Sequence, residues 1–172
     1  MRISEDGEPY KRYRNRIQNG DLLVWSNASG SLITRILLTI VRFFTMSEYS
    51  HVGIAYWDKN DRLYVYEASI PYVHFDYLSE KNSFYWVPMN IKWKDEYLKY
   101  MKKHLGKDYS IIDAIRGYLG KTDISNDKWQ CAELCHDFYY SVGIDLGNNY
   151  TPSKLLKRVL SQLNTSVYYL EN

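Results

Sequence analysis

The sequence has few cysteines, only Cys131 and Cys135 among its 172 residues. Four positions apart on a helix, they would share one face, where a disulfide within a single turn has poor geometry. No second pair of ligands accompanies them at a zinc-binding spacing. We therefore expect neither a disulfide framework nor a structural zinc site, and the cysteines do not indicate an oxidising compartment.

The sequence also lacks a long hydrophobic run. The best candidate for a membrane segment, residues 32–44, is too short to cross a bilayer and is interrupted by Arg35 and Arg42. Residues 1–10 are polar and acidic, unlike a secretory signal. From these features we expect a cytoplasmic protein without a transmembrane segment.

An excess of one charge is missing as well. Lysine and arginine number 22 against 20 acidic residues, a net charge of +2, so nucleic acid is not an expected partner. The basic run within residues 11–16 is interpreted as part of a solvated N-terminal arm, residues 1–18, which shows no clear periodicity. Residues 19–172 are long enough for one domain with its own hydrophobic core.

Two periodicities alternate along this domain. The patterns typical of strands and helices, together with a turn at 58–61 that makes a β-hairpin, predict an α+β fold with a central antiparallel sheet and packed helices. Strands are expected at 22–25, 51–57, 63–68, 72–77, 84–89 and 167–170, and helices at 32–44, 95–105, 111–119, 131–141 and 152–163.

Cys131 is the candidate nucleophile because it begins a predicted helix after a polar segment. Unpaired amides and the helix dipole at such a position favour the thiolate. The alternative is a small buried hydrophobic residue, which is the common fate of a free cysteine. Cys135, one turn further along the same face, is expected in the core.

His51 is the candidate general base among four histidines, because it opens a strongly apolar strand just after a polar segment. An imidazole there could take a proton from a thiol and later protonate the leaving group. His104 and His136 are expected to be surface or packing residues. His74, inside a predicted strand, stays open.

Glu67 is the candidate partner for the second ring nitrogen of His51. If the hairpin pairs position 51 with 67, both side chains lie on one face of the sheet. If the register shifts by one residue, Ala68 lies opposite His51 and Glu67 points away. The sequence pattern leaves both registers open. It also leaves open that Glu67 is an ordinary strand glutamate that faces solvent.

Several motifs in this order resemble the YiiX-type permuted papain-like enzymes, a circularly permuted branch of the NlpC-related cysteine hydrolases. The resemblance covers about residues 19–160, and in such enzymes the histidine strand precedes the cysteine helix. The motifs are Gly20-Asp21-Leu22, residues 45–54, Tyr66-Glu67-Ala68, residues 105–110, Cys131-Ala132-Glu133-Leu134 and Thr151-Pro152.

The resemblance implies a circularly permuted papain-like (NlpC-like) fold with Cys131 as nucleophile, His51 as base and Glu67 as the orienting carboxylate. It also implies hydrolysis of an amide or ester through a covalent acyl-enzyme, with no metal or cofactor. Ala132 departs from the family, where serine commonly follows the cysteine. The expected substrate is a peptide, a peptidoglycan fragment or a lipid-linked amide or ester.

Two other functions stay open. The protein could be a lipid acyl hydrolase or acyltransferase of the same fold, with residues 32–44 in contact with a membrane. It could instead be a catalytically inactive binding module that uses its 18 tyrosines and the basic arm as a surface. The sequence does not predict an oligomeric state.

Overall fold

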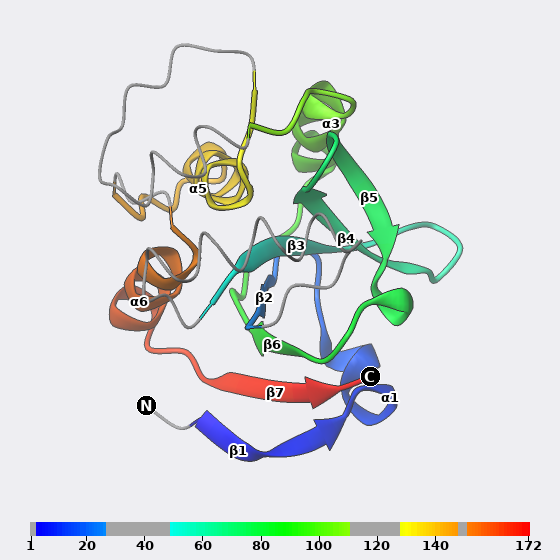
Figure 1. Ribbon diagram of the computed structural model, residues 1–172, viewed down its shortest axis with the longest axis vertical. Coiled ribbons are helices and arrows are strands. Elements are labelled where there is room, and N and C mark those ends of the chain that lie inside the picture. Colours follow the sequence, from blue (N-terminus) through cyan, green and yellow to red (C-terminus); the bar gives the residue numbers. More distant parts are fainter. Residues whose placement is uncertain (1–2, 27–48, 111–127, 148–150) are drawn as a thin grey trace.

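The computed structural model describes residues 3–26, 49–110, 128–147 and 151–172, drawn in colour in Figure 1. Within these residues the protein is a mixed α+β structure with one sheet and several packed helices. The helices expected at 32–44 and 111–119 lie outside the described residues. The mixed α+β structure and its sheet confirm the class and the sheet that the sequence predicted.

The described sheet has seven strands in the order β1-β7-β6-β2-β3-β4-β5. Neighbouring strands pair antiparallel from β7 through to β5, whereas β1 pairs parallel with β7. The strands are β1 (Ile3–Pro9), β2 (Leu22–Trp25), β3 (His51–Trp57), β4 (Leu63–Ala68), β5 (Val73–Tyr77), β6 (Phe84–Val87) and β7 (Val167–Glu171).

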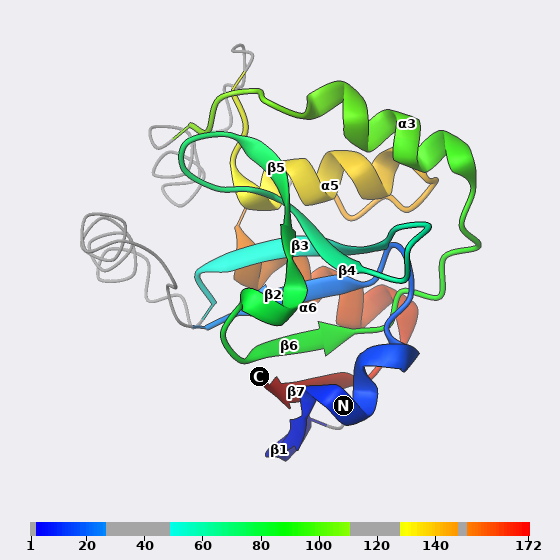
Figure 2. The same cartoon turned by 90° about the vertical axis from the view of Figure 1, so that its right-hand side faces the viewer.

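Three long helices, α3 (Asp95–His104), α5 (Cys131–Ser141) and α6 (Pro152–Leu163), lie together on one side of the sheet (Figures 1 and 2). Thr151 caps α6 by accepting a hydrogen bond from the backbone of Lys154. Short helical turns complete the described elements: α1 (Tyr10–Tyr13), η1 (Arg14–Arg16) and η2 (Leu78–Glu80).

The centre of the sheet is buried on both faces. All four residues of β2 are buried, and because side chains alternate along a strand they enter two different cores. Leu22 and Val24 belong to the larger core, with residues of α3, α5 and α6. Leu23 and Trp25 belong to a second core that contains Tyr10 of α1. A strand buried on both faces appears in the sequence as a continuous apolar run, as Leu22–Trp25 does.

The segment expected as a solvated N-terminal arm, residues 1–18, is integrated into the fold where the structure describes it, from residue 3 onward. Residues 3–9 form the edge strand β1, and Tyr10 and Ile17 are buried in the second core. Arg14 of the basic run lies over the Trp57 ring at 4.4 Å and donates a hydrogen bond to the carbonyl of Asp61. An edge strand as polar as β1 has little apolar alternation, which explains why periodicity did not predict it.

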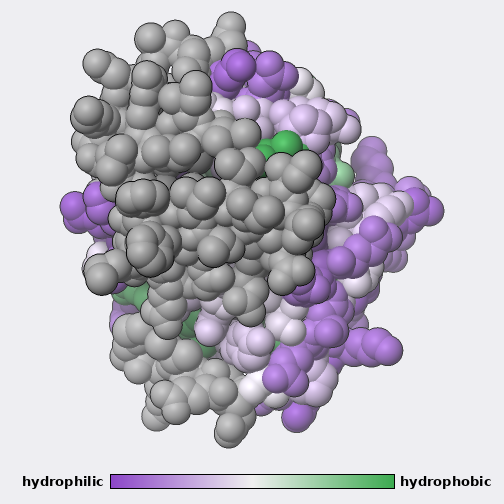
Figure 3. All heavy atoms as spheres, viewed as in Figure 1, coloured by the Kyte–Doolittle hydropathy of each residue, from purple (hydrophilic) through white to green (hydrophobic). Residues whose placement is uncertain are grey.

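The hairpin of β3 and β4 has the bounds predicted from the sequence. Its turn is built on Asp58, whose carboxylate accepts from the backbone of Asn60 and Arg62. The side of the molecule formed by this turn and β5 is mainly hydrophilic in Figure 3. Among the described residues, no helix combines the length and the apolar character needed to span a membrane.

Candidate active site

His51 is the first residue of β3, and its position is fixed by β2. Trp25 is its partner in the β2–β3 register, and the two rings lie 5.5 Å apart between centroids. The backbone N–H of the preceding residue, Ser50, donates to the carbonyl of Trp25 at 2.9 Å. The imidazole is therefore held at the end of the sheet with one flank against a buried tryptophan, and 21% of the side chain stays exposed.

Glu67 of β4 lies on the same face of the hairpin as His51. Ile54 pairs with Tyr66, so one step further along the register places Gly53 beside Glu67. His51 and Glu67 are thus offset by two positions instead of directly opposite, which preserves the shared face. His51 Nε2 donates to Glu67 Oε2 at 2.8 Å, and the Glu67 side chain is only 2% exposed.

Cys131 is the first residue of α5, as expected, with Gln130 as the N-cap. The N-terminal end of α5 and the start of β3 lie at the same end of the molecule (Figure 2), and α5 packs against β3 and β4. Cys131 is buried, with 4% of the residue exposed, and its side chain lies near enough to His51 to raise the pKa of the imidazole. Because Nε2 is engaged by Glu67, Nδ1 is the ring nitrogen that remains for the thiol.

The charges of this group reinforce one another. Burial lowers the pKa of His51, but the negative charge of Glu67 and the hydrogen bonds to Cys131 and Glu67 outweigh it and raise that pKa to about 10. Burial raises the pKa of Glu67, but His51 and Lys81 outweigh it and lower that pKa to about 2. At neutral pH His51 and Glu67 therefore form an imidazolium–carboxylate pair.

The second oxygen of Glu67 has its own partners. Lys81 Nζ donates to Glu67 Oε1 at 2.8 Å and to Asp76 Oδ2 at 2.7 Å. His74, directly opposite Glu67 in the β4–β5 register, has its Nε2 3.5 Å from the same Oε1. Glu67, His74 and Asp76 offer ligand atoms within 4.8 Å of one another, a spacing that a metal ion could bridge. In this structure the Lys81 ammonium bridges the Glu67 and Asp76 carboxylates.

The other expected positions agree with packing roles. Cys135 is completely buried, and this burial raises its pKa well above the ordinary value of a thiol. His104 is buried against the Trp129 and Tyr100 rings. His136 lies on α5 and is partly buried. The structure therefore brings Cys131, His51 and Glu67 together and leaves the remaining cysteine and these two histidines out of the group.

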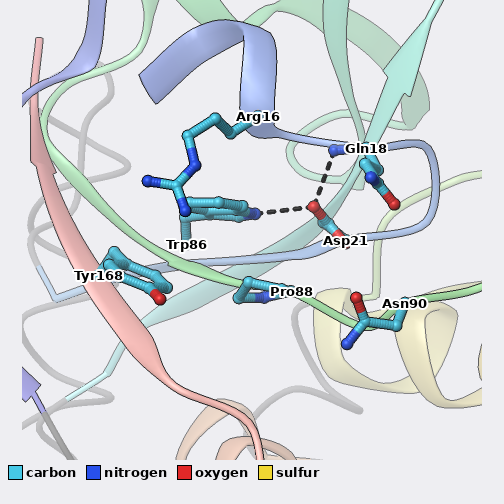
Figure 4. Close-up of a pocket in the computed structure, with 7 residues that line it drawn as sticks. All are labelled: Arg16, Gln18, Asp21, Trp86, Pro88, Asn90 and Tyr168. Atoms are coloured by element: carbon cyan, nitrogen blue, oxygen red, sulfur yellow. Dashed lines mark hydrogen bonds between the residues drawn. The ribbon is translucent and has the colours of Figure 1, made fainter. Parts of the chain in front are cut away.

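A separate cavity of about 400 Å³ lies at the other end of β2 (Figure 4). It contains the carboxylate of Asp21, which is 1% exposed. Asp21 accepts hydrogen bonds from Trp86 Nε1 at 2.7 Å and from the backbone of Gln18 and Met89 at 2.8 and 2.9 Å. Burial raises the pKa of Asp21 despite these bonds. The lining residues are Arg16, Gln18, Asp21, Trp86, Pro88, Asn90 and Tyr168.

Lys81 and Asp76 were not predicted from the sequence. Lys81 lies in the polar stretch 79–83, which has the composition of any surface turn. Asp76 alternates with apolar residues in β5 like an ordinary solvent-facing strand residue. Their common feature is proximity to Glu67, which depends on the β4–β5 register, and no local pattern carries that information.

The three grouped residues have the parts of an activated nucleophile: a thiol, a base in contact with it, and a carboxylate that orients the base. As the first residue of α5, Cys131 also has a backbone N–H that the helix itself does not use. Comparison with protein-family models and with curated proteins finds no match for the chain. The geometry of the site is therefore the basis for assigning a function.

Proposed function

We propose that this protein is a cysteine hydrolase that cleaves an amide or ester bond through an acyl-enzyme on Cys131. One observation carries the proposal: the His51 imidazole contacts the Cys131 side chain and the buried Glu67 carboxylate at the same time. Two elements 80 residues apart in sequence, β3 and α5, supply the base and the thiol (131 − 51).

In the acylation step, the Cys131 thiolate attacks the substrate carbonyl carbon and an S–C bond forms. The carbonyl electrons move to oxygen, and the backbone N–H of Cys131 is positioned to donate to that oxyanion. The C–N or C–O bond then breaks, and the leaving group takes a proton from the imidazolium of His51. Glu67 stabilises the charged ring and fixes its orientation throughout.

Deacylation uses the same groups in reverse. His51, now neutral, takes a proton from water as the water oxygen attacks the thioester carbon. The S–C bond breaks, the carboxylic acid leaves, and the thiolate–imidazolium pair is restored. The cycle consumes one water and needs no other reactant.

We also propose that the domain has a circularly permuted papain-like fold. The supporting observations are that the histidine strand precedes the cysteine helix along the chain, that the helix packs on the sheet, and that the hairpin β3–β4 carries the orienting carboxylate. The substrate class is a peptide, peptidoglycan fragment or lipid-linked amide or ester. The segment that motivated membrane contact, 32–44, lies outside the described residues.

The test is the rate at which iodoacetamide alkylates Cys131 at pH 7, followed by peptide mass. We expect His51→Ala to lower this rate at least about tenfold, because an adjacent imidazolium favours the reactive thiolate. Cys135 supplies an internal reference, since it is fully buried and should not react in the folded protein.

His136→Ala is the matched control, because it removes an imidazole from the same helix without touching the Cys131 group. It should leave the alkylation rate unchanged. If Cys131 reacts no faster than a free thiol, or if His51→Ala leaves its rate intact, the hydrolase proposal is wrong and a binding module with a vestigial site becomes the better account.

A further inference from the structure

The Glu67 carboxylate divides its two oxygens between different tasks. Oε2 accepts from His51 Nε2, whereas Oε1 accepts from Lys81 Nζ, both at 2.8 Å. The Ser69 hydroxyl and His74 Nε2 are each 3.5 Å from Oε1, too far to hold it as firmly. Of these contacts to Glu67 Oε1, the one from Lys81 is therefore the strongest.

Lys81 is itself held in place. Its ammonium also donates to Asp76 Oδ2 at 2.7 Å, and its side chain is only 17% exposed. Its backbone is fixed from both sides: the Lys81 N–H donates to the carbonyl of Leu78, and its carbonyl accepts from Asn172 Nδ2. A lysine with a fixed backbone and two carboxylate partners has little freedom to leave Glu67.

We propose that Lys81 is a positioning residue of the active site, which keeps Glu67 ionised and directs its other oxygen, Oε2, at His51. This inference rests on the proposed function, since it concerns the same site. Asp76 acts one step further out by fixing the Lys81 ammonium.

The need for such a residue follows from burial. A carboxylate with a 2% exposed side chain is strongly disfavoured in its charged form unless cations compensate it. His51 alone would have to both stabilise Glu67 and exchange protons with substrate, and each proton it gives up would leave Glu67 unpaired. The Lys81 ammonium keeps a positive charge beside Glu67 at every stage. The charged or titratable groups around Glu67 are His51, His74, Asp76, Lys81, Cys131 and Cys135.

The experiment compares the rates of Cys131 alkylation by iodoacetamide at pH 5 and pH 8 in the wild type and in Lys81→Met. Without the ammonium, Glu67 gains a proton at higher pH and no longer balances the imidazolium of His51. The pH 5 to pH 8 rate ratio should fall about tenfold, the factor for one unit of pKa. Lys81→Arg should restore most of the wild-type ratio because it keeps the charge.

Lys94→Met is the matched control, since Lys94 also pairs with a glutamate, Glu96, but on the exposed surface. It should leave the ratio unchanged. A merely structural role for Lys81 would lower the rate equally at both pH values or lower the melting temperature alone, and either result would overturn the inference. If Lys81→Met does not fold, Lys81→Gln, which keeps N–H donors without charge, is expected to show the same fall.

A direct titration separates this inference from the proposed function. The ¹³C carboxyl signal of Glu67, assigned with Glu67→Gln, should titrate at higher pH in Lys81→Met than in the wild type. That shift is expected even if Cys131 proves unreactive, in which case only the hydrolase proposal fails. An unchanged titration of Glu67 would contradict the role of Lys81 whatever the reactivity of Cys131.

Discussion

Two buried carboxylates, Asp21 just before β2 and Glu67 in β4, are surrounded by different chemistry. Among the residues that the structure describes, the donors to Asp21 are neutral: the Trp86 indole and two backbone N–H groups. Glu67 accepts from His51 and Lys81, both of which carry positive charge. Burial raises the pKa of Asp21, whereas burial is outweighed by cations at Glu67 and its pKa falls to about 2.

The difference separates a carboxylate that holds the fold from one that prepares a reaction. The bonds to Asp21 join the residue before β2 to β6 and to the segment after it, and none of its partners exchanges protons near neutral pH. The partner of Glu67 is an imidazole in contact with a thiol. Exchanging or removing the two carboxylates should therefore affect different measurements.

The largest effect is expected for Asp21→Ala, on stability. The substitution leaves three donors without their acceptor in a buried place, and we expect the free energy of unfolding to fall by about 4 kcal/mol. That corresponds to a drop in melting temperature of roughly 8–16 °C for a chain of this length. Thermal unfolding measures it, with Asp145→Ala on the exposed surface as control. A drop in melting temperature no larger than that of Asp145→Ala would contradict the claim that Asp21 stabilises the fold.

Acidification should distinguish the two carboxylates next. The pKa of Glu67 is lowered from 4.5 to about 2, so its contribution is complete above pH 4.5 and is lost as the pH falls toward 2. The loss amounts to about 3 kcal/mol. Asp21 has the opposite sign, because its raised pKa makes protonation favour the folded state. Chemical unfolding between pH 5 and pH 3 should therefore show a smaller acid loss in Glu67→Gln than in the wild type.

Asp21→Asn is the control for this acid series, and it should keep the full acid loss that Glu67 causes. At alkaline pH the sign reverses for His51, whose raised pKa stabilises the fold below pH 6.5 and loses that contribution as the pH rises through about 10. An identical acid profile in Glu67→Gln and the wild type would contradict the ion pair.

A third effect concerns reactivity. Glu67→Gln removes the charged acceptor of His51, worth about 2 kcal/mol, and should slow alkylation of Cys131 about 30-fold at pH 7. Asp21→Asn should leave the rate of the folded protein unchanged. If both variants slow the reaction equally, Glu67 acts on Cys131 only through general destabilisation.

The smallest effect is expected for His74→Gln. His74 Nε2 is 3.5 Å from Glu67 Oε1, which is long for a hydrogen bond, and a partly exposed pair of this kind contributes about 0.5 kcal/mol. The alkylation rate of Cys131 should change less than about threefold. A loss as large as that of Glu67→Gln would place His74 inside the reactive group.

Local patterns predicted much of the fold. Leu22–Trp25, the hairpin of His51–Trp57 and Leu63–Ala68, and the helix Cys131–Ser141 have the expected bounds. Each has a continuous apolar run, a strong apolar period or a terminating glycine such as Gly143, whose φ of 88° suits a helix end. The polar edge strand Ile3–Pro9 has neither signal, because it is held by backbone pairing with β7.

The candidate site was predictable only in part, because some of its residues are also placed by pairing between strands. Cys131 and His51 lie at element ends, and element ends can be located from local patterns. The position of Glu67 depends on hairpin register, which the sequence left between two possibilities. Lys81 and Asp76 depend on a second register, between β4 and β5, and on the turn that follows β5. Each further strand pairing adds a choice that no local pattern determines.

The central claim, that Cys131 and His51 act together on an acyl group, is tested most directly by intact mass after mixing the protein with p-nitrophenyl acetate. We expect one acetyl group on Cys131 that forms rapidly, then decays as water hydrolyses the thioester, with both steps slowed in His51→Ala. A Cys131 that never acquires the acetyl group, or that acquires and loses it at the same rates without His51, would contradict the account.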